Sequence, residues 1–483
     1  MNFPLVLNIL GALLIFLAGA LLFPAGVSVW YHDGALPALL ESALISLVAG
    51  LVLMALTRGS RSKREPAIRD GFAIVTFGWL TFALFGAIPF TLSGAIPSYL
   101  DAVFETMSGF TTTGATILIN VELLPESLLF WRAASQWLGG MGIIVLSLAI
   151  LPMLGVGGMQ LFKAEVPGPT ADRLKPRIRD TAKLLWGVYV LLTTLEAGLL
   201  VLGGMDLFDA VCHSFATMAT GGFSTKNASL AAYNSPYLDV VVTLFMFLAG
   251  INFSLHYQVL RGRLDSFWRN EEFLYYVGLT AGTILLLVVI NHGNVYDSLF
   301  ENLRYSSFQV VSILTTTGFG TADYEGWPVL AQYLLVLLMF IGGCAGSTGG
   351  GMKVARFLLL FKHARVQLSR LIHPRAVLLV KIGRTPVDRD VMSAILGFFA
   401  LFMGVFVVAS CLLAATGVDL ITSGAAVIAT LSNIGPGLGQ VGPTDNYAHL
   451  PHLAKGILIV CMLMGRLELY TVLVLLLPSF WRR

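Results

Sequence analysis

The sequence contains few charged residues. Asp, Glu, Lys and Arg make up 12% of the 483 residues, whereas 56% are hydrophobic. Soluble globular domains carry about 25% charged residues, so this composition excludes a soluble domain and predicts a polytopic membrane protein. The net charge of +3 would indicate anionic partners only if the charges clustered on one soluble face. Because they are distributed as membrane topology requires, no nucleic-acid partner is expected.

Cysteine is also scarce. The four cysteines lie far apart in apolar stretches and show no paired spacing: Cys212, Cys344, Cys411 and Cys461. This pattern excludes a cysteine-based metal site and predicts no disulfide. The first apolar segment lacks a basic start and a small-x-small cleavage site, so it is expected to be a retained helix. No tightly bound cofactor is expected.

Long apolar stretches dominate the rest of the chain. A membrane-crossing helix needs roughly twenty apolar residues, and ten stretches meet that length, near 3–28, 36–57, 70–92, 129–154, 181–204, 237–260, 273–291, 329–361, 391–416 and 453–478. The sequence therefore predicts an all-α membrane protein with ten crossings. The first two form a hairpin to which no chemistry is assigned.

Four shorter apolar segments lie between the members of the last four pairs of crossings, near 100–112, 207–219, 301–316 and 420–432. Each is too short to span a bilayer, which predicts four re-entrant helices. Glu105 and Glu301 are placed at the starts of two of them, where a carboxylate complements the positive end of the helix dipole. They are alternatively expected to attract cations at the mouth.

Each short segment runs into a similar turn: Thr111–Thr116, Met218–Phe223, Thr315–Gly320 and the weaker Ser432–Gly437. The motif recurs about every 100 residues, which marks one fold unit repeated four times. A single Thr-Thr-Gly would be an ordinary turn. Four copies in a membrane chain indicate backbone that lines an aqueous path, because irregular backbone at membrane depth is tolerated only there or where protein buries it.

A ring of backbone carbonyls at such turns is a cation filter. None of the four turns contains Asp or Glu, which argues against a calcium-type filter built from side chains. The fourth copy departs from the threonine pattern at Asn433, Ile434 and Pro436. The candidate carbonyl donors are Thr112, Thr113 and Gly114, then Ala219, Thr220 and Gly221, then Thr316, Thr317 and Gly318, and finally Asn433, Ile434 and Gly435.

The four turns, in this order, resemble those of the TrkH/KtrB family of potassium translocation subunits, relatives of the plant HKT transporters. The resemblance covers the chain from about residue 70 to its end. It implies four helix, pore-helix, filter and helix repeats around one pore, at residues 70–162, 163–269, 270–389 and 390–483, after an N-terminal hairpin at 1–69. In plant relatives serine at the first filter glycine accompanies sodium transport, and glycine at all four filters accompanies potassium transport. This chain has glycine at all four.

The resemblance also implies partners and a location. They are a cytosolic TrkA-like nucleotide-binding ring, a second copy of the chain in a homodimer, and the bacterial inner membrane.

The basic residues set the expected orientation. If both termini are cytoplasmic, all but five of the 30 Lys and Arg residues fall in inner loops or the tail, which is the bias that the positive-inside rule predicts. Nine of them lie in the 353–389 segment, which makes it a candidate contact for the ring. The five exceptions are Arg132, Lys226, Arg304, Lys455 and Arg466.

Two features indicate a gate. The run Gly342–Gly351 interrupts the eighth crossing, and glycine at this density breaks a helix. Arg466 falls midway along the last crossing, where a charge is costly unless it is paired or faces water. Glu468 and Glu196 are candidate partners, although residues two apart on a helix do not face each other. The resemblance implies a pore-plugging loop beside a pore arginine, here Gly346, Ser347, Thr348, Gly349 and Gly350 with Arg466.

Three functions remain open from the sequence. The first is a potassium uptake channel subunit, and the second is a sodium- or proton-coupled symporter of the same class. The filter residues do not distinguish these two, because they do not determine whether transport is coupled to a second ion. The third is an intramembrane enzyme. It is disfavoured because Ser347 lacks the Gly-x-Ser-x-Gly spacing and Met352 stands where a phosphate loop needs lysine. His449 and His452 are expected in a surface loop.

Overall fold

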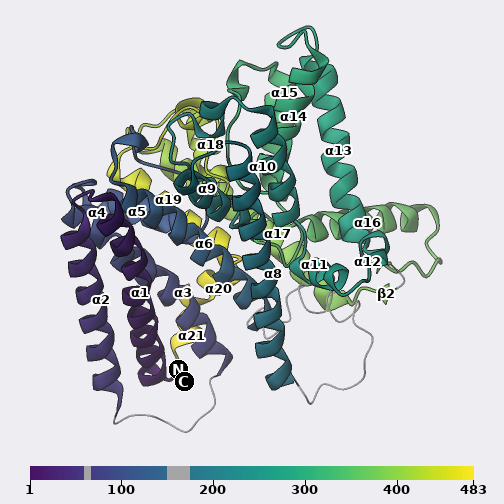
Figure 1. Cartoon of the computed structure of the whole chain (residues 1–483). Helices are drawn as coiled ribbons and strands as arrows, with labels where there is room; N and C mark the ends of the chain where they lie inside the picture. The colour runs from purple at the N-terminus through teal and green to yellow at the C-terminus, as the bar shows by residue number, and fades with distance from the viewer. Residues whose placement is uncertain (59–66, 150–173, 384, 483) are drawn as a thin grey trace.

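The computed structural model describes residues 1–58, 67–149, 174–383 and 385–482. Helices make up nearly all of its regular structure, and the sheet in the described chain is one antiparallel hairpin, β1 (Lys381–Ile382) and β2 (Thr385–Pro386). Long helices surround shorter ones that lie toward one end of the molecule (Figure 1). The predicted all-α polytopic fold is confirmed.

The helices follow the order that the sequence predicts. The N-terminal hairpin is α1 (Phe3–Tyr31) and α2 (Leu36–Thr57). The first repeat contains α3 (Ile68–Gly86), α4 (Ile88–Leu92), α5 (Tyr99–Phe110) and α6 (Glu126–Ala149), and the second contains α8 (Leu174–Leu202), α9 (Leu207–Met218), α10 (Pro236–Ala249) and α11 (Phe253–Leu260). The predicted boundary between these repeats, at residues 162 and 163, lies outside the described residues.

The second half repeats the arrangement. α12 (Asp265–Arg269) is the last helix of the second repeat. The third repeat contains α13 (Glu271–Asn291), α14 (Leu299–Leu314), α15 (Val329–Ile341) and α16 (Val354–Ile372). The fourth contains α17 (Arg389–Ala414), α18 (Leu420–Leu431), α19 (His452–Arg466), α20 (Tyr470–Leu473) and α21 (Pro478–Trp481). Short 3-10 turns lie in the connections at η2 (Val121–Leu123), η5 (Ser229–Tyr233), η6 (Tyr324–Gly326), η7 (Gly439–Val441) and η8 (Val474–Leu476).

Four short helices, α5, α9, α14 and α18, are the predicted re-entrant helices and are called the pore helices below. They have 12, 12, 16 and 12 residues. Each begins at a side chain that accepts a hydrogen bond from a free backbone N–H of the first turn: Ser98, Asp206, Ser298 and Asp419. Such caps fix where a helix begins. The pore helices therefore start at defined positions and end within the protein.

The predicted crossings are confirmed in most places. Among the described residues, six helical segments are long and apolar enough to cross a membrane, and two pairs of helices bent by more than 40° are apolar enough to count as one broken span each. α10 and α11 meet at 101°, and α19 and the segment that begins with α20 meet at 113°, so the segments predicted to cross near 237–260 and 453–478 are sharply bent. The eighth predicted crossing is broken too, because α15 ends at Ile341 before the glycine run. α6 runs up to residues outside the described part.

The N-terminal hairpin packs through two glycines. A Cβ on Gly11 would lie 2.8 Å from the carbonyl oxygen of Gly50, and a Cβ on Gly50 would lie 2.7 Å from that of Gly11. Both distances are too short for a side chain. The two backbones therefore cross in direct contact, which is how small residues stabilise helix pairs in membranes.

Asp33, in the loop between α1 and α2, ties the hairpin to the first repeat. Its carboxylate accepts hydrogen bonds from the Ser28 hydroxyl, the Ala35 N–H (3.1 Å) and the Ser127 N–H at the start of α6 (2.8 Å). Burial raises the pKa of Asp33, but the bonds from Ser127 and Ser28 outweigh burial and hold this pKa below its ordinary value.

The two ends of the chain lie together at one end of the helices (Figure 1). The rings of Phe3 and Trp481 stack with centroids 6.3 Å apart, and Arg69 Nη1 donates to the carbonyl of Arg482 (2.9 Å). Both termini are therefore on the same side, as the predicted orientation requires.

We expect Asp33→Ala to lower the stability of the folded protein by about 1 kcal/mol at neutral pH, because the Ser127 N–H loses its acceptor and solvent screens part of the effect. Since the folded-state pKa is lowered, the contribution is present above the ordinary aspartate pKa of about 3.9 and is lost as the pH falls through the folded-state value. Thermal unfolding in detergent across this pH range measures it. An unchanged melting temperature in Asp33→Ala would contradict the assignment.

Candidate functional site

The four pore helices end in the same backbone turn. In the first, the Thr112 N–H donates to the Gly109 carbonyl (2.9 Å) and the Thr113 N–H donates to the Ser108 carbonyl (2.8 Å). These two bonds form a Schellman motif, which stops a helix and places one residue in the left-handed conformation. The equivalent bonds occur in the other three. The left-handed residues are Thr112 (φ 51°), Thr220 (φ 54°), Thr316 (φ 62°) and Asn433 (φ 56°).

Glycine usually fills this position, and threonine there is strained. A left-handed conformation costs a residue with a Cβ about 1–2 kcal/mol. The strain persists because the surrounding protein encloses the four residues, each of which is at most 1% exposed. The four turns are therefore held in shape by packing rather than by local preference.

Four glycines join the turns into a closed ring. Each has a positive φ, and a Cβ added to any of them would collide with a carbonyl of the next turn. The pairs are Gly114 with the Gly221 carbonyl, Gly222 with the Thr317 carbonyl, Gly318 with the Ile434 carbonyl, and Gly435 with the Thr113 carbonyl. The structure thus brings together all four predicted turns. The turn of each repeat contacts the turn of the next repeat, and the turn of the fourth contacts that of the first.

The ring corrects the register of the second turn. The sequence alignment set Gly221 against Gly114, but Gly222 has the positive φ of 75° and Gly221 does not. The Gly221 N–H also makes the bond to the residue five back that Thr113 makes in the first turn. Gly222 is therefore the equivalent of Gly114. The set that matches Thr112, Thr113 and Gly114 begins at Thr220, one residue later than Ala219.

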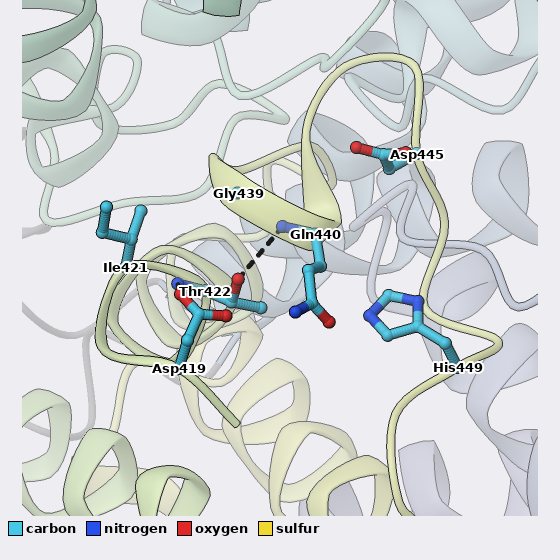
Figure 2. Close-up of a pocket in the computed structure, with 7 residues that line it drawn as sticks. All are labelled: Asp419, Ile421, Thr422, Gly439, Gln440, Asp445 and His449. Carbon is cyan, nitrogen blue, oxygen red and sulfur yellow. Dashed lines mark hydrogen bonds between the residues drawn. The ribbon is translucent and has the colours of Figure 1, made fainter. Parts of the chain in front are cut away.

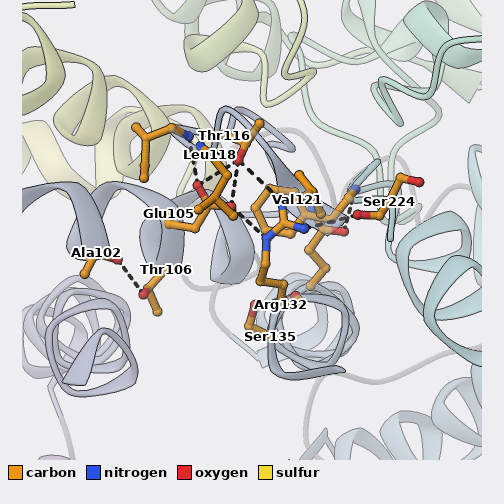
Figure 3. Close-up of polar contacts among 12 residues, drawn as sticks. Ala102, Glu105, Thr106, Thr116, Leu118, Val121, Arg132, Ser135 and Ser224 are labelled. Atoms are coloured by element: carbon orange, nitrogen blue, oxygen red, sulfur yellow. Dashed lines mark hydrogen bonds and ion pairs between the residues drawn. The ribbon is translucent and has the colours of Figure 1, made fainter. Parts of the chain in front are cut away.

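Glu105 and Arg132 form a buried ion pair next to the first turn (Figure 3). Glu105 lies in the middle of α5, so its predicted place at the start of the helix is wrong; the helix begins at Tyr99. Its carboxylate pairs with Arg132 Nε at 2.8 Å and accepts from the Thr116 hydroxyl and the Ile117 N–H. Both charged side chains are at most 3% exposed. A buried pair with its hydrogen bonds satisfied fixes the segment that follows the first turn.

Arg132 and its neighbour Gln136, both on α6, also hold the second turn. Arg132 Nη1 donates to the Ser224 carbonyl at 3.1 Å. Gln136 donates from Nε2 to the Gly221 carbonyl (2.6 Å) and accepts from the Phe223 N–H (3.1 Å). The first repeat thereby positions the second filter.

In the fourth turn, Asn433 stands where the other turns have threonine, and its side chain bonds to two other elements. Asn433 Nδ2 donates to the Thr113 hydroxyl (2.9 Å) and to the Met462 carbonyl (3.0 Å). A threonine could not reach both acceptors, because it has only one donor. The departure from the threonine pattern therefore links the fourth turn to the first turn and to α19.

A cavity of about 560 Å³ lies at the start of α18, against the segment that follows the fourth turn. Asp419, Gln440, Asp445 and His449 line it, and the Thr422 hydroxyl accepts a hydrogen bond from the Gln440 N–H at 3.0 Å (Figure 2). Within the described residues, no group of three or more His, Cys, Asp or Glu side chains is arranged to hold a metal ion.

The glycine run forms an irregular loop at the inner ends of the pore helices. The Thr348 hydroxyl donates to the Met218 carbonyl at the end of α9 (3.0 Å). The Gly350 N–H donates to the hydroxyl of Thr316 (2.6 Å). The Gly351 N–H donates to the carbonyl of Ser432 (3.0 Å). The loop thus touches the second, third and fourth turns, and at Thr316 it contacts one of the strained residues directly.

Arg466 binds the loop and not a carboxylate. Its Nη1 donates to the Thr348 carbonyl (2.7 Å) and its Nη2 to the Gly139 carbonyl on α6 (3.1 Å). Glu468, one of the two candidate partners, pairs instead with Arg356. The other, Glu196, is fully buried and has no hydrogen-bond partner in the described part of the chain. Arg466 is 2% exposed, so its charge is held by carbonyl dipoles.

Lys353 is a second buried cation at the loop. Its ammonium donates to the Gly349 carbonyl, and the residue is 8% exposed. The sequence assigned Lys353 to an inner basic loop, so this contact was missed. Its position directly after the glycine run was the available signal.

Similar proteins place this architecture in a family. The model of the TrkH family, described as a cation transport protein, matches residues 38–482. The chain belongs to the TrkH family. The TrkH-family relatives "Trk system potassium uptake protein TrkH" from Salmonella typhimurium and from Halomonas elongata are 46% and 43% identical, each over the full length of both chains. The crystal structure of the potassium transporter TrkH from Vibrio parahaemolyticus matches with a TM-score of 0.92 and 40% identity over all of both chains.

The ring generates a prediction for this TrkH-family chain. Serine at Gly222 would clash with the Thr317 carbonyl in a backbone conformation that disfavours a side chain, whereas serine at Gly221 would meet only the amide of Gln136. We expect Gly222→Ser to lower the rubidium-to-sodium flux ratio by about tenfold or more, which corresponds to about 1.4 kcal/mol. Gly221→Ser should lower it less. Flux into proteoliposomes measures both, and an equal or reversed order would reject the corrected register.

Proposed function

We propose that the chain takes up potassium through the centre of the ring. The supporting observation is the closed contact of four carbonyl-bearing turns, each at the C-terminal end of a pore helix. Helix C-termini carry partial negative charge, which favours a cation next to them. The full-length relatives named as potassium uptake proteins of the Trk system support the same substrate.

The four turns suit a monovalent cation that must also be released. Carbonyl dipoles replace the water of a dehydrated ion without a fixed negative charge, so binding stays reversible. The proposed donors are the carbonyls of the twelve filter residues named from the sequence, with the second set moved to Thr220, Gly221 and Gly222. Strained, buried backbone keeps the donors from collapsing when the ion leaves.

We further propose that the 342–351 loop and Arg466 form the gate. The loop contacts three of the turns. Arg466 links the loop to α6 of the first repeat, because it donates to the Thr348 carbonyl of the loop and to the Gly139 carbonyl of α6. The positive charges of Arg466 and Lys353 raise the barrier for a cation that leaves the filter. Transport would require the loop to part from these bonds.

Rubidium uptake into proteoliposomes tests the transport proposal. Uptake down a rubidium gradient alone is the expected result. A requirement for a sodium or proton gradient would favour the symporter instead, and absence of any uptake would reject the proposal.

For the gate, we expect Arg466→Ala to raise rubidium flux about 5- to 30-fold, as removal of roughly 1–2 kcal/mol of barrier would do. Deletion of residues 346–350 should also raise flux. Neither should change the rubidium-to-sodium ratio, because barrier height and differential binding are separate terms. Arg466→Lys, which keeps the charge, is the control. A loop deletion that alters the ion ratio while total flux stays constant would assign the loop to the filter.

We infer a cytosolic partner and a location from the family resemblance. The proposed partner is a TrkA-like nucleotide-binding ring that contacts the 353–389 segment, with the protein as a homodimer in the bacterial inner membrane and both termini cytoplasmic. Arg365, Arg370 and Arg375 are exposed on and after α16, which supports a contact there. Attraction of these residues to anionic lipid is the competing interpretation.

Charge reversal of Arg365, Arg370 and Arg375 to Glu should reduce capture of the ring by at least about tenfold, because three exposed ion pairs would become repulsive. Pull-down of the purified ring at low salt measures this. Reversal of Arg261 and Arg263, on another inner loop, is the matched control. Undiminished ring binding with reduced binding to anionic vesicles would identify lipid as the partner of the 353–389 segment.

A further inference from the structure

A second cavity lies away from the ion path, between the helices of two repeats. It measures about 400 Å³ and is lined by α10 and α13 at its sides and by Ser307 and Val311 of the pore helix α14. Val240 and Leu244 of its α10 wall are 63% and 52% exposed. Large apolar side chains with this exposure face acyl chains in a membrane protein, so the cavity opens toward lipid.

The polar end of this cavity is a buried ion pair. Arg304 Nε donates to Asp239 Oδ2 at 2.7 Å, and the two side chains are 10% and 3% exposed. Asp239 Oδ1 has no hydrogen-bond partner among the described residues. An unmet buried acceptor is costly. A donor supplied from the cavity would complete the site.

Both members of the pair lie near the start of their helices, where lipid headgroups are expected. Asp239 is in the first turn of α10, and Arg304 is in the second turn of α14. Tyr237, two residues before Asp239, is 44% exposed, as is usual for aromatic residues at the membrane interface. From the pair, the cavity continues along apolar residues of α13, including Val277, Ala281 and Ile284.

We propose that this cavity binds a phospholipid with a primary amine headgroup, such as phosphatidylethanolamine. Its ammonium supplies the donor that Asp239 Oδ1 lacks, and its phosphate accepts from the terminal amino groups of Arg304, which the bond from Nε leaves unused. One acyl chain lies along α13. A zwitterionic headgroup matches the charges of the ion pair, whereas phosphatidylglycerol brings hydroxyl donors but no ammonium, so its net negative charge stays uncompensated beside the Asp239 carboxylate. The bound lipid would support α14, the pore helix that ends in the third filter.

Native mass spectrometry of the delipidated full-length protein, titrated with defined lipids, tests the proposal. Phosphatidylethanolamine should bind at least about tenfold more tightly than phosphatidylcholine, whose quaternary amine has no N–H donor, and more tightly than phosphatidylglycerol. Asp239→Asn should abolish the preference between the two zwitterionic lipids. Ala281→Phe, which fills the groove and leaves the ion pair intact, should abolish binding, whereas Val289→Phe on the same helix should not.

Three results would overturn the proposal. Equal binding of the two zwitterionic lipids to the unaltered protein removes the role of the amine, and this comparison needs no variant to fold. Preference for phosphatidylglycerol would identify an anionic-lipid site. Efficient disulfide cross-linking of two Leu244→Cys chains would show that a second copy, and not lipid, covers the cavity.

Discussion

The contact between a glycine of one filter and a carbonyl of the next constrains the rest of the molecule. It leaves no room for a Cβ at any of the four places. Four helix ends can meet this closely only if each helix stops at a fixed residue, which the capping side chains and the Schellman turns ensure. The long helices, the bends and the buried ion pairs hold those helix ends in position.

Much of the support for the ring crosses between repeats. Arg132 and Gln136 of the first repeat hold the second filter, and Asn433 of the fourth holds the first. The loop of the third repeat touches the second and fourth. The first, second and fourth turns therefore depend on contacts from other repeats. This interlocking explains how strained threonines persist where glycine would be the relaxed choice.

The sequence predicted what depends on local chemistry. Repeated Thr-Gly turns predicted where the four short helices end, glycine density predicted where α15 stops, and a charge in an apolar segment singled out Arg466, which is buried beside the glycine run. It failed where the answer depends on distant contacts. Of the two adjacent glycines, the sequence favoured Gly221, and the backbone conformation of Gly222 and its contact with the Thr317 carbonyl show that Gly222 is the equivalent of Gly114. Gln136 is an ordinary polar residue in its helix, and its partner lies 85 residues away.

The four filters belong to one polypeptide, and this has a consequence for how such a pore can diverge. In a channel assembled from four identical subunits, one codon change alters every quadrant of the filter at once. Here a change alters a single quadrant, and the sequence of the other three stays as it was. Asn433 differs in this way from its threonine counterparts, and it makes two hydrogen bonds of its own, to Thr113 and to Met462. A pore built from one polypeptide can therefore lose its four-fold symmetry through one substitution at a time.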